Sequence, residues 1–151
     1  MQSRTSQLPP ASPVPHVIRR QYHGVPRHLI SLTAVVGARP NFVKMAPILE
    51  EAGRRSAFQC RLIHTGQHYS PEMSATFFDE LGMPAPDVNL EIGSGSHTAQ
   101  AAGVMLRLET ELSERRPDLL LVVGDVNSTL ACSLVAVKKG IPVVHLSLIH
   151  I

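Results

Sequence analysis

Two segments of this chain repeat the same order of a buried strand, a glycine, a polar turn and a helix. The first strand, 29–36, is Leu-Ile-Ser-Leu-Thr-Ala-Val-Val before Gly37, and the second, 119–123, is Leu-Leu-Leu-Val-Val before Gly124. Short, almost continuous apolar runs of this kind are typical of parallel strands that are covered on both faces. The alternation therefore predicts an α/β fold, a Rossmann-like parallel sheet flanked by helices.

Periodicity and turn residues divide the rest of the chain in the same way. Further strands are expected at 58–64 and 141–145, a short extended piece at 87–91, and helices at 40–54, 71–81, 96–115 and 128–139. We predict one domain over residues 28–145. Residues 1–27 hold five of the twelve prolines and show no hydrophobic periodicity. We interpret them as a disordered extension, which either a misassigned start codon or an organellar transit peptide would explain.

The turn after the first strand carries two cations at the start of a helix. Pro40 suits the first helical position, where its missing N–H costs least, and helix N-termini favour anions. Arg39 could grip a diphosphate with a forked pair of hydrogen bonds, and Lys44 follows about one turn later. Gly37 to Lys44 therefore predict a phosphate site. The alternative is a solvated helix start with no ligand.

The turn after the second strand carries a carboxylate. In an open parallel sheet, ligands bind beyond the carboxyl ends of the strands, where the strand order reverses. Asp125 is expected at such an end, with Asn127 and Ser128 beside it. The alternative is that these side chains cap the helix that follows, because Asp, Asn and Ser are all good N-cap residues.

Five segments together resemble one family, the non-hydrolysing UDP-N-acetylglucosamine 2-epimerases. Their order and spacing make the resemblance specific, and it runs through the segments 37–47, 64–69, 93–97, 116–129 and 140–145. The family has the two-domain GT-B fold shared with many glycosyltransferases. The resemblance implies that this chain is the N-terminal half of such a fold, truncated.

The resemblance implies an isomerase that converts UDP-GlcNAc to UDP-ManNAc by eliminating UDP and adding it back, without a cofactor. Arg39 would bind UDP, Lys44 would lie near the reacting sugar, and Asp125 would be one of several active-site carboxylates. Gly37, Pro40, Ser96 and Asn127 are further candidates for substrate binding. Gln67 and His68 match a segment that, in bacterial members, contacts a second UDP-GlcNAc acting as an allosteric activator. The family also suggests homodimers that supply cell-envelope polysaccharide synthesis.

The family pattern breaks off after residue 145. The resemblance predicts Glu-Ala-Gly-Leu-Arg there, with a catalytic glutamate, and later a second domain. Residues 146–151 read Leu-Ser-Leu-Ile-His-Ile instead, which is one translation of a common transposase-library sequencing adapter. We interpret them as an assembly artefact on a truncated gene product that is itself inactive. The alternative is a natural extension of the last strand.

Composition argues against several other classes of protein. With no Trp, two Tyr and four Phe, the chain offers no aromatic platform for nucleic acid. No apolar run approaches the roughly 18 residues of a membrane span, so we take the cytoplasm as the default location. Cys60 and Cys132 are isolated and are expected to be reduced core thiols. His64 and His68 have a metal-like spacing, but Gly66 lies between them and no acidic partner adjoins, so we expect no metal.

Two other functions stay open. One is a related enzyme with the same fold, either a hydrolysing epimerase or a glycosyltransferase. The other is a standalone domain that binds a nucleotide sugar without catalysis.

Overall fold

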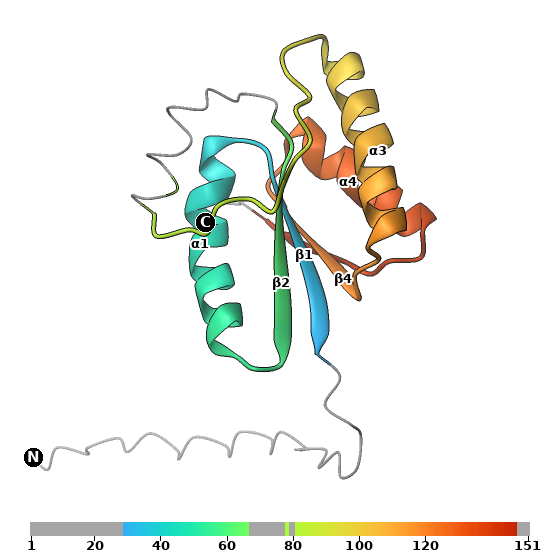
Figure 1. Ribbon diagram of the computed structural model, residues 1–151. Coiled ribbons are helices and arrows are strands. Elements are labelled where there is room, and N and C mark those ends of the chain that lie inside the picture. Colours follow the sequence, from blue (N-terminus) through green and yellow to red (C-terminus); the bar gives the residue numbers. More distant parts are fainter. Residues whose placement is uncertain (1–28, 67–77, 79–80, 148–151) are drawn as a thin grey trace, which may run out of the picture.

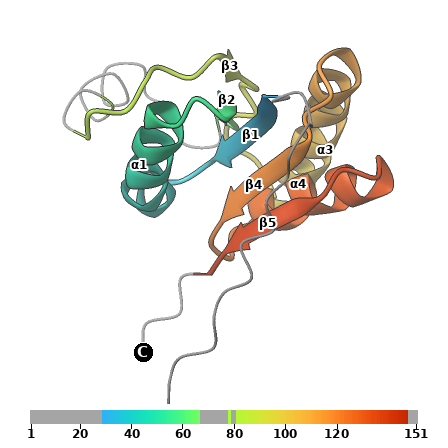
Figure 2. The same cartoon turned by 90° about the horizontal axis from the view of Figure 1, so that it is seen from below.

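A five-stranded parallel sheet forms the centre of the molecule. The computed structural model describes residues 29–66, 78 and 81–147. The strands lie side by side in the order β3-β2-β1-β4-β5, and every neighbouring pair is parallel (Figures 1 and 2). Their bounds are Ile30–Val36 (β1), Phe58–His64 (β2), Val88–Asn89 (β3), Leu119–Val123 (β4) and Val143–Leu146 (β5). The predicted fold class is confirmed.

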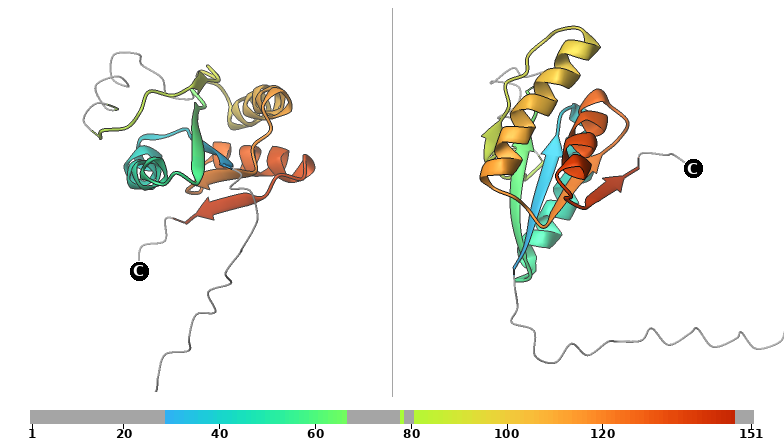
Figure 3. Two further views of the ribbon diagram at one scale, coloured as in Figure 1. Left: turned by 60° about the horizontal axis from the view of Figure 1, so that its bottom comes forward. Right: turned by 90° about the vertical axis from the view of Figure 1, so that its right-hand side faces the viewer.

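Helices cover both faces of this sheet. Helix α1 (Arg39–Arg54) lies on one face, and α3 (His97–Glu114) and α4 (Asn127–Lys138) lie on the other (Figures 1 and 3). Two apolar clusters result, one on each side. An apolar stripe of α3 packs in the cluster on the side of α3 and α4, because Val104, Leu108 and Leu112 are fully buried against the sheet and α4. Alternate residues of β1 and β4 contribute to opposite clusters, as strands buried on both faces must.

Observed and predicted bounds differ most at the two edge strands, β3 and β5. β5 begins at Val143 because Ile141 still belongs to the turn that ends α4, with its N–H donating to the Ala136 carbonyl at 2.9 Å. Pro142 leads into the strand, and its carbonyl accepts a hydrogen bond from Leu120 N at 2.9 Å. It continues to Leu146, which pairs with Val123. The strand thus enters the segment that we interpret as adapter, and the origin of 146–151 stays a prediction. The extension 1–27 and most of the expected helix 71–81 lie outside the described residues.

The order of the strands creates a switch point. From β1 the chain moves outward through β2 to β3, and then it returns to the other side of β1 with β4 and continues to β5. The connections that leave β1 and β4 therefore lead to opposite faces of the sheet, to α1 and α4 (Figure 2). Such a reversal opens a crevice between the two strand ends, which is the usual ligand site of open α/β sheets.

Candidate active site

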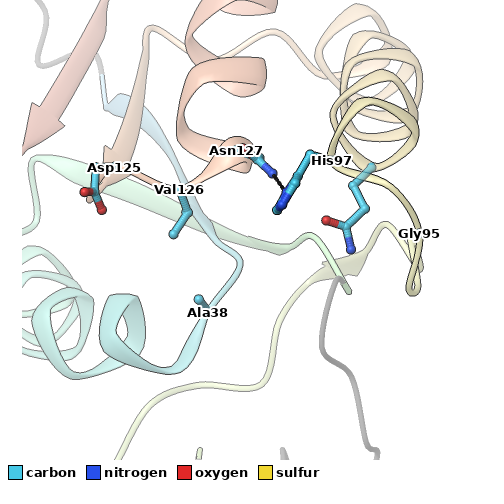
Figure 4. Close-up of a pocket in the computed structure, with 7 residues that line it drawn as sticks. Ala38, Gly95, His97, Asp125, Val126 and Asn127 are labelled. Atoms are coloured by element: carbon cyan, nitrogen blue, oxygen red, sulfur yellow. Dashed lines mark hydrogen bonds between the residues drawn. The ribbon is translucent and has the colours of Figure 1, made fainter.

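A pocket of about 370 Å³ lies at this switch point. Ala38, from the turn after β1, forms one wall, and the turn after β4 forms another with Asp125, Val126 and Asn127 (Figure 4). The rest of the lining comes from the start of α3, through Gly95, His97 and Gln100. Segments far apart in the sequence thus meet at the carboxyl edge of the sheet.

Three helices begin around the pocket. Ala38 is the N-cap of α1 and Val126 is the N-cap of α4, and neither helix start has a side-chain cap. Ser96 caps α3, because its hydroxyl accepts a hydrogen bond from Ala99 N at 3.2 Å. The first backbone N–H groups of a helix have no acceptor within the helix, and the helix dipole adds partial positive charge there. The pocket is therefore suited to an anion such as a diphosphate.

The turn that carries Asp125 is held by its neighbours. Gly124 has a φ of 80°, a left-handed conformation that glycine adopts without strain. Its carbonyl accepts a hydrogen bond from His145 Nε2 at 2.8 Å, and its N–H donates to the Leu146 carbonyl at 3.0 Å. Thr129 Oγ1 donates to the Val123 carbonyl at 2.8 Å. The exposed side chain of Asp125 therefore projects from a fixed backbone.

Asn127 contacts His97, which also lines the pocket. Asn127 Nδ2 lies 2.6 Å from His97 Nδ1, and the two side chains point toward each other, whereas Asp125 lies on the other side of Val126 (Figure 4). The alternative, that Asn127 or Asp125 caps α4, is wrong, because the N-cap position falls on Val126 and has no side-chain cap. Ser128, the other capping candidate, is buried within the first turn of α4.

The end of β2 is tightly built around His64. Its ring is stacked on Phe42 with ring centroids 5.4 Å apart, and its Nδ1 accepts a hydrogen bond from Gly66 N at 3.0 Å. Burial lowers the pKa of His64 below its ordinary value, and a side-chain hydrogen bond with Asn89 acts in the opposite direction. A neutral ring is what an acceptor at Nδ1 requires. His64 therefore fixes the backbone that leads into the predicted allosteric segment.

The other predicted site residues are spread around this edge of the sheet. Gly37 is buried, and Pro40 is exposed at the second rather than the first position of α1. Lys44 is half-buried one turn further on and is not among the described residues that line the pocket. The side chain of Arg39 and the whole of Gln67 and His68 lie outside what the structure describes. Their roles stay predictions.

His97 and Gln100 are pocket residues that sequence reasoning did not select. His97 closes the segment Gly93 to His97, which we matched to the family, but only Ser96 was assigned a contact there. Because 30 residues separate His97 from Asn127, no local pattern links them. The strand order alone brings them together.

No metal site or membrane-spanning element is found in the described part of the chain. Within it, no three His, Cys, Asp or Glu side chains gather where they could hold an ion. None of its helices is long and apolar enough to cross a membrane. Both cysteines are free, and burial raises the pKa of the Cys132 thiol to about 12, which makes that thiol a poor nucleophile.

Comparisons with known proteins bear on this pocket. Residues 50–147 match the model of a family described as UDP-N-acetylglucosamine 2-epimerase. A UDP-N-acetylglucosamine 2-epimerase homolog of Methanococcus maripaludis is 47% identical over 116 residues, covering 77% of this chain and 32% of the relative. This chain belongs to the UDP-N-acetylglucosamine 2-epimerase family. It spans about a third of the length of these relatives.

A solved member of the family agrees with the fold. The UDP-GlcNAc 2-epimerase of Methanocaldococcus jannaschii, solved in complex with UDP-GlcNAc and UDP, superimposes with a TM-score of 0.73 at 40% identity. The match covers 77% of this chain and 32% of that enzyme. A more distant relative from Pseudomonas aeruginosa, 34% identical over 117 residues and covering 78% of this chain and 33% of its own, is a UDP-2,3-diacetamido-2,3-dideoxy-D-glucuronate 2-epimerase. Family members thus differ in the sugar they are named for.

Proposed function

We propose that this chain is the N-terminal, substrate-binding part of an epimerase that interconverts UDP-GlcNAc and UDP-ManNAc. One observation carries the proposal. A single pocket at the switch point combines three helix starts, which suit a diphosphate, with the exposed carboxylate of Asp125. The match of this chain to an enzyme solved with UDP-GlcNAc and UDP supports the same ligand.

Epimerisation at C2 requires a base near C2 of the sugar and cations near the leaving diphosphate. A carboxylate removes the C2 proton, the electron pair of that C–H bond forms the C1=C2 double bond, and UDP leaves with the electrons of the C1–O bond. UDP then adds back to the 2-acetamidoglucal as a proton returns to the opposite face of C2. Asp125 supplies one carboxylate, and the helix starts with Arg39 and Lys44 stabilise the diphosphate.

Other features of the parent protein belong to the same proposal. The chain spans about a third of the length of its relatives, so we expect these residues to be inactive by themselves. The complete protein would be a cytoplasmic homodimer, and Gln67 and His68 would contact an activating UDP-GlcNAc. The non-hydrolysing course is favoured over release of free ManNAc because the matched segments resemble the non-hydrolysing members.

A second substrate should be compared directly. The Pseudomonas relative is named for a UDP sugar with an additional acetamido group and a carboxylate. UDP-GlcNAc is the first candidate because the Methanocaldococcus enzyme that this chain matches at 40% identity was solved with it. Both sugars should be assayed.

The test replaces Asp125 by Asn in the complete protein restored from the source gene. Asn keeps the shape of Asp but removes the negative charge, so we expect kcat for UDP-ManNAc formation to fall by about 100-fold or more. The dissociation constant for UDP should stay the same or fall, because the negative charge that repels the diphosphate has been removed. Asp118→Asn, remote from the pocket at the opposite end of β4, is the control. Unchanged turnover in Asp125→Asn would refute the catalytic role.

A further inference from the structure

The contact between Asn127 and His97 determines which ring nitrogen of His97 carries the proton. Nδ2 of an amide can only donate a hydrogen bond, so the imidazole nitrogen that it approaches must accept. With Asn127 Nδ2 at 2.6 Å from His97 Nδ1, Nδ1 is therefore the acceptor. A neutral ring with an acceptor at Nδ1 has its proton on Nε2.

The Nε2–H group of His97 points into the pocket. Nδ1 and Nε2 lie at different corners of the ring, so a ring that is held through Nδ1 presents Nε2 away from Asn127. Among the contacts of the described residues, no protein group accepts a hydrogen bond from His97 Nε2. In Figure 4 the ring lies beside the open space that Ala38 and Val126 border. A donor without a protein acceptor is thus directed into a pocket that is suited to an anion.

We propose that Asn127 is a positioning residue that holds His97 with its proton on Nε2, and that this N–H donates a hydrogen bond to a diphosphate oxygen of the sugar nucleotide. The ligand in this inference rests on the proposed function. Because His97 is the first residue of α3, its side chain and the α3 helix start act on the same anion. A diphosphate is therefore favoured over a sugar hydroxyl, which gains nothing from the helix dipole.

The tautomer can be observed without any ligand. In the 15N-labelled complete protein, long-range 1H–15N spectra should show His97 with a protonated Nε2 and an unprotonated Nδ1. Asn127→Ala should abolish this preference for one tautomer. A His97 with its proton on Nδ1 in the unmodified chain would overturn the proposal, because Asn127 would then present its carbonyl oxygen instead.

The ligand contact is tested by inhibition of the complete protein. His97→Ala and Asn127→Ala should each raise the inhibition constant of UDP by about tenfold, the usual size for loss of a hydrogen bond to a charged group. His97→Gln retains an N–H donor and should stay within about threefold of the unmodified protein. A rise in KM for UDP-GlcNAc with no change for UDP would place the contact on the sugar and overturn the diphosphate assignment.

A double variant separates positioning from simple support of the fold. Glutamine has no tautomers, so Asn127→Ala should cost little further UDP affinity when residue 97 is already Gln. If Asn127 merely supports α4, the same loss would appear in both backgrounds, and the positioning role would be overturned. If the unmodified complete protein neither binds UDP nor turns over UDP-GlcNAc, the proposed function and the proposed ligand are both wrong. The tautomer of His97 is measured without ligand, so that part of the proposal is tested independently.

Discussion

His64 is the residue whose ionisation should show in the stability of the fold. Its folded-state pKa is lowered by burial, so at acid pH the unfolded chain binds a proton that the folded chain excludes. The contribution of His64 to the free energy of unfolding is complete above about pH 6.5, the pKa of histidine in the unfolded chain. It is lost as the pH falls below that value. We expect the free energy of unfolding, measured by urea titration, to decrease from pH 7.5 to 5.5. The free energy of unfolding of the His64→Gln variant should decrease less over the same pH range. Equal decreases in the two proteins would show that His64 does not cause the pH dependence.

Single residues of the site differed in how far the sequence could predict them. Asp125 and the Ser96 cap follow from local patterns, a polar residue after a buried strand and a serine before an amphipathic helix. Asn127 does not cap α4, because the N-cap position falls on Val126 and the Asn127 side chain contacts His97, 30 residues away. His97 escaped selection for the same reason, since its role depends on which strands are neighbours.

At the scale of elements, the end of β2 comes very close to the loop after β3 at Gly66. Gly66 has a φ of 75°, and a Cβ there would lie 2.7 Å from Asn89 Oδ1 and 2.8 Å from the Glu91 backbone. Gly66→Ala should therefore lower the free energy of unfolding by about 2 kcal/mol or more. Thermal or urea unfolding measures this change.

Gly53 provides the matched control for this substitution. It lies in α1, and a methyl group on its Cα would meet no atom within 4 Å. Gly53→Ala should therefore be neutral or stabilise the protein by up to about 1 kcal/mol, because alanine favours the helix. Similar effects at the two glycines would show that the close approach at Gly66 is not rigid.

Element prediction succeeded where one pattern dominated. β4 matches its predicted bounds, and α3 falls within its predicted range because a serine cap begins it and an apolar stripe runs through it. β5 was placed two residues early because Ile141 is apolar and buried although it belongs to the turn. Burial alone does not distinguish a buried turn residue from a strand residue.

At the scale of the whole molecule, alternation of strands and helices predicted a parallel sheet but not the order of its strands. That order, β3-β2-β1-β4-β5, brings Ala38, Asp125 and His97 to one pocket. It depends on contacts between distant segments, which no local pattern encodes. The family resemblance predicted site residues only at positions with a matching motif.

The central claim is that the parent protein epimerises UDP-GlcNAc at C2 by elimination and re-addition of UDP. The most direct measurement incubates the complete protein with UDP-GlcNAc in D2O and follows the sugar signals by 1H NMR. We predict that UDP-ManNAc appears with deuterium at C2 and that the nucleotide sugar stays intact, because the returning proton comes from solvent. Release of free ManNAc, or UDP-ManNAc that keeps its original hydrogen at C2, would contradict the account.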